Sequence, residues 1–282
     1  MRARAPGSAA NLGPGFDALG LALDVHVEVE VREADALSVT ATGCGSDLPC
    51  DAGHLAARVA CAVAGTDRLA IAVHSAIPVG RGLGSSAAVA VAAAAAAGAV
   101  DPLAWGARHD GHPENAAASA LGGLVAAADL GGRPTARRLP LDTELRVVAL
   151  IPERPLPTAE ARAALPPAVP FGDAAFNLGR MGLLVAGLAD LDELVAAAGD
   201  DRLHQGRRAA LFPEAPGLLE GLRQAGALTS FWSGAGPSLL GVCRAPAAAA
   251  LAGAAAGLLA GAGVAGEVRV LAPDLQGVVQ LG

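Results

Sequence analysis

Apolar and polar residues alternate in two segments of the first half of the chain. Within Ala22–Val31, valine occupies every second position from Val25 onward, and histidine or glutamate lies between the valines. The same period of two recurs from Leu69 to Ile77. Because successive side chains of a β-strand point to opposite faces, the pattern predicts two strands that are each buried on one face.

Helix-forming residues and turn residues separate these strands from the rest of the first half. We expect helices over 55–65, 85–97 and 115–121, with glycine at or just after each end, and a strand over 124–128. The segment 131–140 has two glycines and two prolines, and it predicts a link between a domain over 1–140 and a second over 141–282.

The second half alternates between strand and helix signals. Strands are expected over 145–151, 227–232, 238–243 and 264–271, and helices over 176–191 and 247–260. The segment 152–170 has too many prolines for one long helix. The order β-α-β-β-α-β is that of ferredoxin-like domains, so the fold class is α+β.

Charge and composition exclude several classes of function. The formal net charge is −7 without a block of basic residues, and aromatic residues make up 2% of the 282 positions, which argues against nucleic-acid and membrane-surface binding. The longest apolar run, 87–97, is far short of the ~20 residues of a membrane span. The four cysteines form no C-x-x-C pair and no signal-peptide pattern opens the chain, so we expect a soluble cytoplasmic protein with reduced thiols.

A glycine-rich segment, PVGRGLGSSAA, joins the second predicted strand to a predicted helix. The first turn of a helix carries unpaired N–H groups and the positive end of the helix dipole, and glycine lets the backbone pass close to phosphate oxygens. This context predicts a phosphate-binding loop made of Pro78, Val79, Gly80, Arg81, Gly82, Leu83, Gly84, Ser85, Ser86, Ala87 and Ala88.

Two familiar phosphate loops are excluded by this segment. A Walker A loop needs a lysine after its last glycine, and a dinucleotide fingerprint needs G-x-G-x-x-G rather than the G-x-G-x-G found here. A tight strand-to-helix turn without a ligand remains the alternative interpretation.

Polar residues among turn residues mark further candidate ligand sites. Asn11 and Asp17 stand among glycines and a proline, as in a clamp for a small ligand, although Asx turns in a terminal loop give the same pattern. The segment RHDGHPEN holds Asp110, His112 and Asn115, which together suit a corner for a metal ion and a substrate. A solvated loop that ends in a helix cap is the alternative.

Three residues of the second half complete the set. Arg162 and Arg208 are either surface arginines or residues whose guanidinium groups bind a carboxylate through two parallel hydrogen bonds. Gly234 lies in a second glycine turn, SGAGP, that can approach a ligand.

The loop PVGRGLGSSAA resembles the phosphate loop of the GHMP kinases. The segments NLGPGFDALGLAL, GHPEN, TAEAR, FNLGR, DRLHQ and SGAGP resemble, in the same order, those of the homoserine kinases within that family. The resemblance covers nearly the whole chain. It implies an N-terminal ATP-binding domain like domain 2 of ribosomal protein S5, followed by the ferredoxin-like domain.

The resemblance also implies a reaction and roles for the candidate residues. Homoserine kinases use ATP and Mg²⁺ to phosphorylate the side-chain hydroxyl of L-homoserine on the path to threonine. By similarity the loop holds the phosphates, Ser86 and Asp110 bind magnesium, and Asn115 meets the attacking hydroxyl. By the same similarity, Asn11 and Asp17 bind the amino group of the substrate. Its carboxylate is surrounded by His112, Arg162 and Arg208, with Gly234 beside them.

The chain departs from the family pattern at a few positions. Asp110 replaces the glutamate that usually binds magnesium, His54 replaces an asparagine near the adenine, and Ser8-Ala9 replaces a Thr-Ser pair. No residue is a convincing general base, so we expect direct in-line transfer. Another GHMP small-molecule kinase and a non-catalytic nucleotide or amino-acid binder are the alternatives, and a homodimer is left open.

Overall fold

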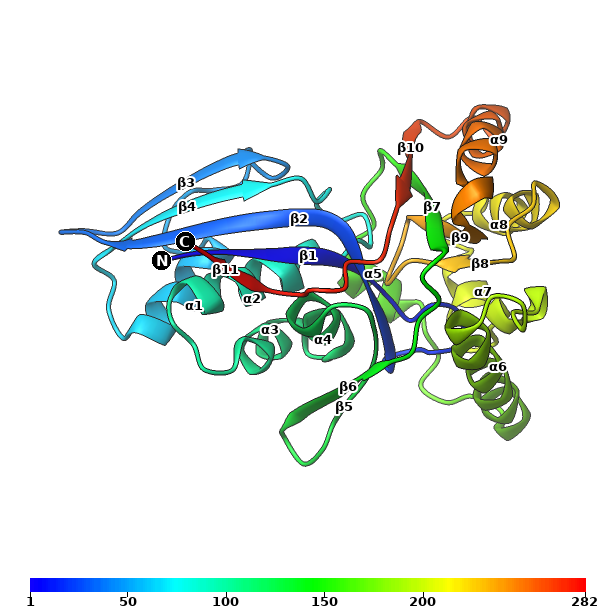
Figure 1. Ribbon diagram of the computed structural model, residues 1–282, viewed down its shortest axis with the longest axis horizontal. Coiled ribbons are helices and arrows are strands. Elements are labelled where there is room, and N and C mark those ends of the chain that lie inside the picture. Colours follow the sequence, from blue (N-terminus) through cyan, green and yellow to red (C-terminus); the bar gives the residue numbers. More distant parts are fainter.

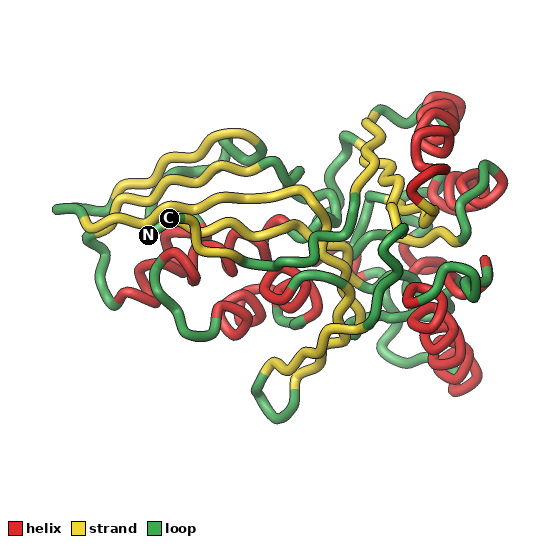
Figure 2. The backbone as a smooth tube through the Cα atoms, viewed as in Figure 1, coloured by secondary structure: helices red, strands yellow, loops and turns green.

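The computed structural model describes residues 1–282, apart from the side chain of Asp110. Two β-sheets, each with helices packed on one face, form two lobes that meet near the middle of the molecule (Figure 1). Figure 2 shows loops and turns gathered at this boundary between the two lobes.

The first sheet has seven strands. Its main path runs β11-β1-β2-β4-β3, and β5 pairs with β2 and with β6. The strands are β1 (Arg2–Ala10), β2 (Leu19–Glu33), β3 (Ser38–Gly43), β4 (Leu69–Ser75), β5 (Leu124–Asp129), β6 (Pro134–Leu139) and β11 (Val279–Leu281). The alternating segments predicted as half-buried strands are β2 and β4.

Helix α2 is the central element beneath this sheet. The helices of the lobe are α1 (Leu55–Ala64), α2 (Ser85–Ala96), α3 (Pro102–Asp110) and α4 (Glu114–Leu121). Helix α2 is apolar all round, and it contacts β1, β2 and the other three helices of the lobe. An all-apolar helix is stable only when buried, and alanine lets its neighbours approach closely. The phosphate-loop candidate at its N-terminus therefore rests on the core.

The second sheet has four antiparallel strands in the order β10-β7-β9-β8. This is the fourth-first-third-second order of a β-α-β-β-α-β unit. The first helix packed on its strands is the one over Ala215–Gln224, rather than the expected helix over 176–191. The strands are β7 (Leu145–Pro152), β8 (Thr229–Trp232), β9 (Leu239–Arg244) and β10 (Gly266–Leu271), and the helices are α5 (Thr158–Ala163), α6 (Phe171–Ala189), α7 (Gln205–Arg208), α8 (Ala215–Gln224) and α9 (Ala248–Gly261), with short 3-10 turns over Ala196–Gly199 and Ala245–Ala247.

Two sequence-based expectations about the domain division need correction. The segment 131–140 is not a linker, because Gly131 and Gly132 make the turn of a hairpin whose second strand is β6. Figure 1 shows this hairpin projecting from the molecule. The end of the chain also leaves the second sheet, since β11 pairs with β1 in the first one.

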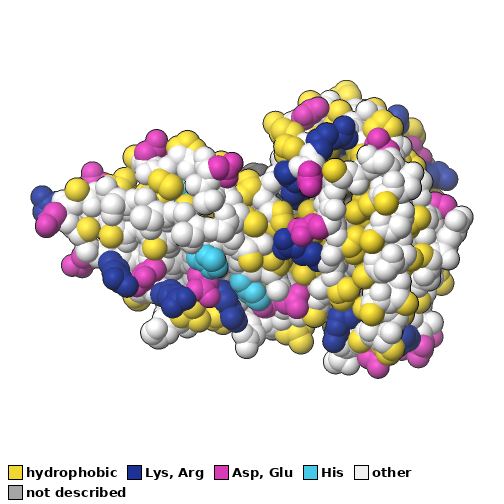
Figure 3. Space-filling model, turned by 90° about the horizontal axis from the view of Figure 1, so that it is seen from above, with side chains coloured by type: hydrophobic (Ala, Val, Ile, Leu, Met, Phe, Trp, Pro, Cys, Tyr) yellow, Lys and Arg dark blue, Asp and Glu magenta, His cyan; other side chains and the backbone are white. Residues whose placement is uncertain are grey.

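None of the described helices is both long and apolar enough to cross a membrane. On the face drawn in Figure 3, basic and acidic side chains are interspersed rather than gathered in one large area of a single sign.

Candidate functional site

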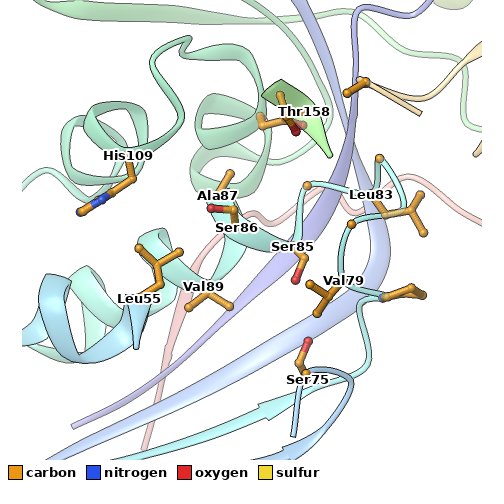
Figure 4. A pocket seen from close by; sticks show the side chains of 18 of the residues that line it. Leu55, Ser75, Val79, Leu83, Ser85, Ser86, Ala87, Val89, His109 and Thr158 are labelled. Atoms are coloured by element: carbon orange, nitrogen blue, oxygen red, sulfur yellow. The ribbon is translucent and has the colours of Figure 1, made fainter. Parts of the chain in front are cut away.

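One cavity of about 720 Å³ lies where the two sheets meet. Its walls come from the loop before α2, the starts of α1, α4 and α5, and the turn after β8. In Figure 4, Ser85 and Ser86 lie at the start of α2, and Thr158 of α5 lies across from them. A cavity of this size suits a small-molecule ligand.

The carbonyl groups of the phosphate-loop candidate are all held from behind. The carbonyl oxygens of four successive residues, 80 to 83, each accept a hydrogen bond from another segment. The donors, in that order, are Leu156 N at 3.2 Å, Ser238 N at 3.3 Å, Ser233 Oγ at 2.6 Å and Ser8 N at 3.0 Å. Three of these donors come from the second half of the chain.

The N–H groups of the same loop are left for the cavity. Within a trans peptide the N–H points away from the carbonyl, so tying the carbonyls down turns the N–H groups the other way. Among the described residues, no backbone or side-chain group accepts a hydrogen bond from the N–H groups of residues 81–86. Unpaired N–H groups at the start of a buried helix are a ready site for phosphate oxygens.

Two glycines of the loop are required by its packing. Gly82 and Gly84 have φ angles of 75° and 66°. A Cβ on Gly82 would lie 2.3 Å from the carbonyl oxygen of Ser233, and one on Gly84 would lie 2.1 Å from Ser8 Oγ. Both contacts are impossible, so only glycine fits at these positions.

Two other residues of the predicted loop do not line the cavity. The Arg81 side chain turns outward and donates to the carbonyl oxygens of Val79, at 3.0 Å, and of Glu153. Ala88 is fully buried within α2. The cavity wall at this loop is therefore formed by its remaining residues, and the Ser86 side chain is exposed in the cavity.

The loop between β1 and β2 has a strained backbone that presents Asn11 and Asp17. Asn11, Leu12 and Asp17 have φ between 51° and 69°, a conformation that non-glycine residues rarely adopt. Asn11 stabilises it, since its Nδ2 donates to the Gly234 carbonyl at 2.9 Å and its Oδ1 accepts from the Asp17 N–H at 3.0 Å. Asn11 thus joins the first lobe to the SGAGP turn.

Arg162 reaches from α5 to the same loop. Its two terminal nitrogens donate to the two carboxylate oxygens of Asp17, at 2.6 and 3.2 Å. Both side chains are about one third exposed. Arg162 lines the cavity, while Asp17 lies behind it and is not itself part of the wall.

Arg208 is buried at the same end of the cavity. Its Nη1 donates to the Gly234 carbonyl and to His204 Nδ1, each at 2.9 Å. Burial and the nearby charge of Arg162 lower the pKa of Arg208 to about 10, which leaves it charged at neutral pH. The predicted binding arginines therefore come together from distant parts of the sequence.

The GHPEN segment supplies a second buried polar group. His112 Nδ1 lies 2.7 Å from Glu114 Oε1, and the Glu114 side chain is 1% exposed. Burial alone would lower the pKa of His112, but the hydrogen bond and charge of Glu114 outweigh it and raise that pKa. Glu114 Oε2 has no hydrogen-bond partner among the described residues, so one buried carboxylate oxygen is available at the cavity wall.

Asn115 connects this segment to the phosphate loop. Its Oδ1 accepts from Ser8 Oγ at 2.9 Å, and the backbone N–H of Ser8 holds the Leu83 carbonyl. Asn115 therefore lines the cavity and is linked through Ser8 to the phosphate-loop candidate.

The opposite end of the cavity is apolar. Leu55 and Val89 lie together there, with His109 close by (Figure 4). His54 caps α1, since its Nδ1 accepts from the Ala56 N–H at 3.2 Å, and burial lowers its pKa. A flat nucleobase fits such an apolar wall with a few polar edges.

The described oxygen donors are compatible with a magnesium ion. Magnesium prefers oxygen ligands and keeps several waters, and the Ser86 hydroxyl and Glu114 Oε2 both reach the cavity. The predicted ligand Asp110 has a side chain outside the described part of the structure. Asp17, His112 and Glu114 also have ligand atoms within 4.8 Å of one another, but Asp17 is already paired with Arg162.

Sequence reasoning did not identify several residues of this site. Glu114 and Thr158 line the cavity, and Ser8, Ser233 and His204 hold its walls. Glu114 precedes Asn115 in the GHPEN motif, and its position at the start of a predicted helix is the signal that could have identified it. The roles of the other four depend on contacts between segments that are far apart in the sequence.

Comparisons with known proteins agree with this geometry. Residues 53–123 match the model for the GHMP kinase N-terminal domain, and residues 183–263 match that for the GHMP kinase C-terminal domain. The homoserine kinase of Solibacter usitatus is 42% identical over 84% of this chain and 83% of its own length, and that of Streptomyces coelicolor is 42% identical over 87% and 85%. A crystal structure of homoserine kinase from Cytophaga hutchinsonii superposes with a TM-score of 0.87 at 27% identity, covering 99% of this chain and 96% of that one. The chain belongs to the GHMP kinase family.

Proposed function

We propose that the protein is a homoserine kinase, which transfers the γ-phosphoryl group of ATP to the side-chain hydroxyl of L-homoserine. The observation that carries the proposal is that one cavity combines two adjoining parts of different chemistry. One part of it has a row of unpaired N–H groups, and the adjoining part has paired acids and arginines. The homoserine kinases among its relatives support the choice of substrate.

The amino-acid end of the cavity suits a zwitterion. Asn11 and Asp17 bind the ammonium group in this proposal, and His112, Arg162 and Arg208 surround the carboxylate, beside Gly234. Arginine forks match a carboxylate, and the carboxylate of Asp17 matches an ammonium. This assignment follows the resemblance, and it is supported by the place of Asn11, His112, Arg162, Arg208 and Gly234 in the cavity wall; Asp17 lies behind that wall, paired with Arg162.

The transfer itself needs positioning and charge neutralisation more than covalent chemistry. The loop N–H groups and the α2 dipole hold the phosphates. Ser86 and Asp110 would hold Mg²⁺, which would neutralise charge on the phosphates. Asn115 orients the hydroxyl, whose oxygen bonds to the γ-phosphorus as the bond to the β-γ bridging oxygen breaks.

The proton of the hydroxyl leaves late in this scheme, to a phosphoryl oxygen or to water. Glu114 adds a buried carboxylate oxygen that has no hydrogen-bond partner in the described part of the chain, so it is available to accept a hydrogen bond from the hydroxyl. No separate general base is required.

ADP release in a coupled assay tests the proposed function. L-homoserine should support turnover, while L-serine, which is one methylene shorter, L-threonine and mevalonate should support little. Release with mevalonate alone would assign the chain to another branch of the family. Binding of ATP and L-homoserine without ADP release would indicate a non-catalytic binder.

The same proposal places the protein in the cytoplasm, in threonine biosynthesis. It leaves the oligomeric state to be measured, and a homodimer is the form to test first.

A further inference from the structure

His204 is a fully buried histidine that lies behind the cavity rather than in its wall. Its Nε2 is 2.7 Å from the carbonyl oxygen of Gly13, and its Nδ1 is 2.9 Å from Nη1 of Arg208. The ring of Phe16 packs against the imidazole at 5.3 Å between centroids. Both ring nitrogens are therefore occupied.

These partners allow only one protonation state. The Gly13 carbonyl can only accept, so the proton lies on Nε2, and Arg208 can only donate, so Nδ1 has none. The imidazole must be neutral. Burial lowers the pKa of His204 to about 4, and the charge of Arg208 adds to this, against opposing contributions from Asp201 and Asp17.

The imidazole links segments that carry the substrate-binding residues. Gly13 belongs to the strained loop between Asn11 and Asp17. Arg208 also donates to the Gly234 carbonyl, which accepts from Asn11 as well. The His204 ring thus closes a network from the ammonium-binding loop through the carboxylate-binding arginine to the SGAGP turn.

We propose that His204 is a positioning residue for amino-acid recognition. As a neutral imidazole it fixes the Arg208 guanidinium and the Asn11–Asp17 loop relative to each other, and so sets the spacing between the binding groups for a carboxylate and an ammonium. It touches neither substrate nor nucleotide. The inference rests on the proposed function, since it assigns His204 to the homoserine half of the site.

Two conservative substitutions separate the two hydrogen bonds of the imidazole. His204→Asn places an acceptor oxygen near the position of Nδ1 and keeps the bond to Arg208. His204→Gln places a donor near the position of Nε2, keeps the bond to Gly13 and loses the acceptor for Arg208.

We expect His204→Gln to raise KM for L-homoserine at least about tenfold and His204→Asn to raise it less, with KM for ATP within about twofold of the wild type in both. Arg207→Gln, an exposed neighbour of Arg208, is the control and should change neither constant.

A double-mutant cycle distinguishes positioning from a general structural role. In an Arg208→Met background, His204→Gln should raise KM for L-homoserine little further, because the effect of His204 on substrate binding passes through Arg208. Full additivity, or equal increases in both KM values, would overturn the proposal. Thermal unfolding shows that each variant is folded before its kinetics are compared.

Nitrogen-15 NMR of the imidazole tests the proposal without relying on turnover. At about pH 5.5, where an ordinary histidine is mostly protonated, His204 should show a neutral ring with its proton on Nε2. A doubly protonated ring at that pH would overturn the inference. Absence of homoserine-dependent ADP release in the wild type would instead refute the proposed function, and the two failures are separate.

Discussion

At the scale of single residues, the site is a set of charges that satisfy one another. Asp17 and Arg162 form a two-bonded ion pair between the two lobes. An amino acid carries one charge of each sign, so its ammonium can take a bond of Asp17 and its carboxylate a bond of Arg162 without leaving either residue unpaired. In the proposed function, recognition of the amino acid is thus an exchange of ion pairs.

Replacing Arg162 with methionine tests this exchange. Arg162→Met removes the carboxylate partner and leaves Asp17 without its cation. A hydrogen bond to a charged group contributes about 1.5–3 kcal/mol, so KM for L-homoserine should rise about 10- to 100-fold while KM for ATP stays near its original value. Steady-state kinetics with Arg137→Gln, an exposed arginine of β6, provide the control. Equal effects of the two variants would contradict the assignment.

A second residue-scale prediction concerns the phosphate half. Ser233→Ala removes the donor to the Gly82 carbonyl, so that carbonyl is freed to turn and the loop N–H groups lose order. We expect KM for ATP to rise about threefold to tenfold, since one such bond contributes about 1 kcal/mol, and KM for homoserine to change little. Ser238→Ala is a matched control, because the buried Ser238 hydroxyl has no partner among the described residues and its backbone N–H still holds Arg81. If Ser238→Ala raised KM for ATP as much as Ser233→Ala does, the result would argue against this account.

At the scale of elements, a buried helix and a glycine-rich loop together make the proposed phosphate site. Helix α2 is fixed by the core, and its N-terminal loop is held from behind by residues of both halves of the chain. The loop is therefore held in place without a ligand, and in the proposed function its N–H groups and the α2 dipole supply the charge that a Walker lysine supplies elsewhere.

Adding one methyl group to the loop should abolish this arrangement. In Gly84→Ala the new Cβ would meet Ser8 Oγ at 2.1 Å, at a φ that alanine avoids, so the loop must move. We expect ADP release to fall at least about 100-fold with the fold retained. Gly253→Ala, at an open position inside α9, should leave activity intact and raise stability slightly. Activity retained in Gly84→Ala would show that the loop is not the phosphate site.

The sequence predicted elements whose pattern is set locally. The long alternation of β2 was identified because it marks one buried face, and α2 because its alanine-rich run consists almost entirely of helix-forming residues. Strand β1 escaped prediction because its second part, 5–10, consists of small residues and a proline that are buried on both faces, and β3 because it is short and half polar. The segment 131–140 was misassigned because glycine and proline mark an edge hairpin as readily as a linker.

Site residues follow the same distinction. Motif residues such as Ser86 and Asn115 were found because their chemistry is visible in a short segment. Ser233 and His204 were not, since the Gly82 carbonyl that Ser233 holds and the Gly13 carbonyl that His204 contacts lie 151 and 191 positions away in the chain.

At the scale of the molecule, the end of the chain closes the first sheet. His26 Nε2 lies 2.8 Å from Asp274 Oδ2, and the other Asp274 oxygen accepts from the N–H groups of Gln276 and Gly277, each at 2.8 Å. This turn directs the chain toward β11, which pairs with β1. The two lobes are thus tied by the tail as well as by the cavity contacts.

The Asp274 contact should make stability depend on pH. Burial alone would raise the pKa of Asp274, but the hydrogen bonds from His26 and the backbone outweigh it and lower that pKa. Its stabilisation is therefore present above the ordinary aspartate pKa and is lost as pH falls through the lowered value. Asp274→Asn should cost about 1–3 kcal/mol at neutral pH and much less at about pH 3, measured by denaturant unfolding. Asp192→Asn, at a side chain that is 87% exposed, should cost little at either pH. A loss in Asp274→Asn that does not change with pH would contradict this role.

The central claim is that one cavity joins a phosphate cradle to a binding site for a zwitterionic alcohol. Its most direct test is kcat/KM for L-homoserine beside 3-aminopropan-1-ol, which lacks the carboxylate, and 4-hydroxybutanoate, which lacks the ammonium group. The account predicts that each analogue is poorer by at least about 100-fold, because each leaves a charged group of the site unpaired. Equal values for the three alcohols would contradict it.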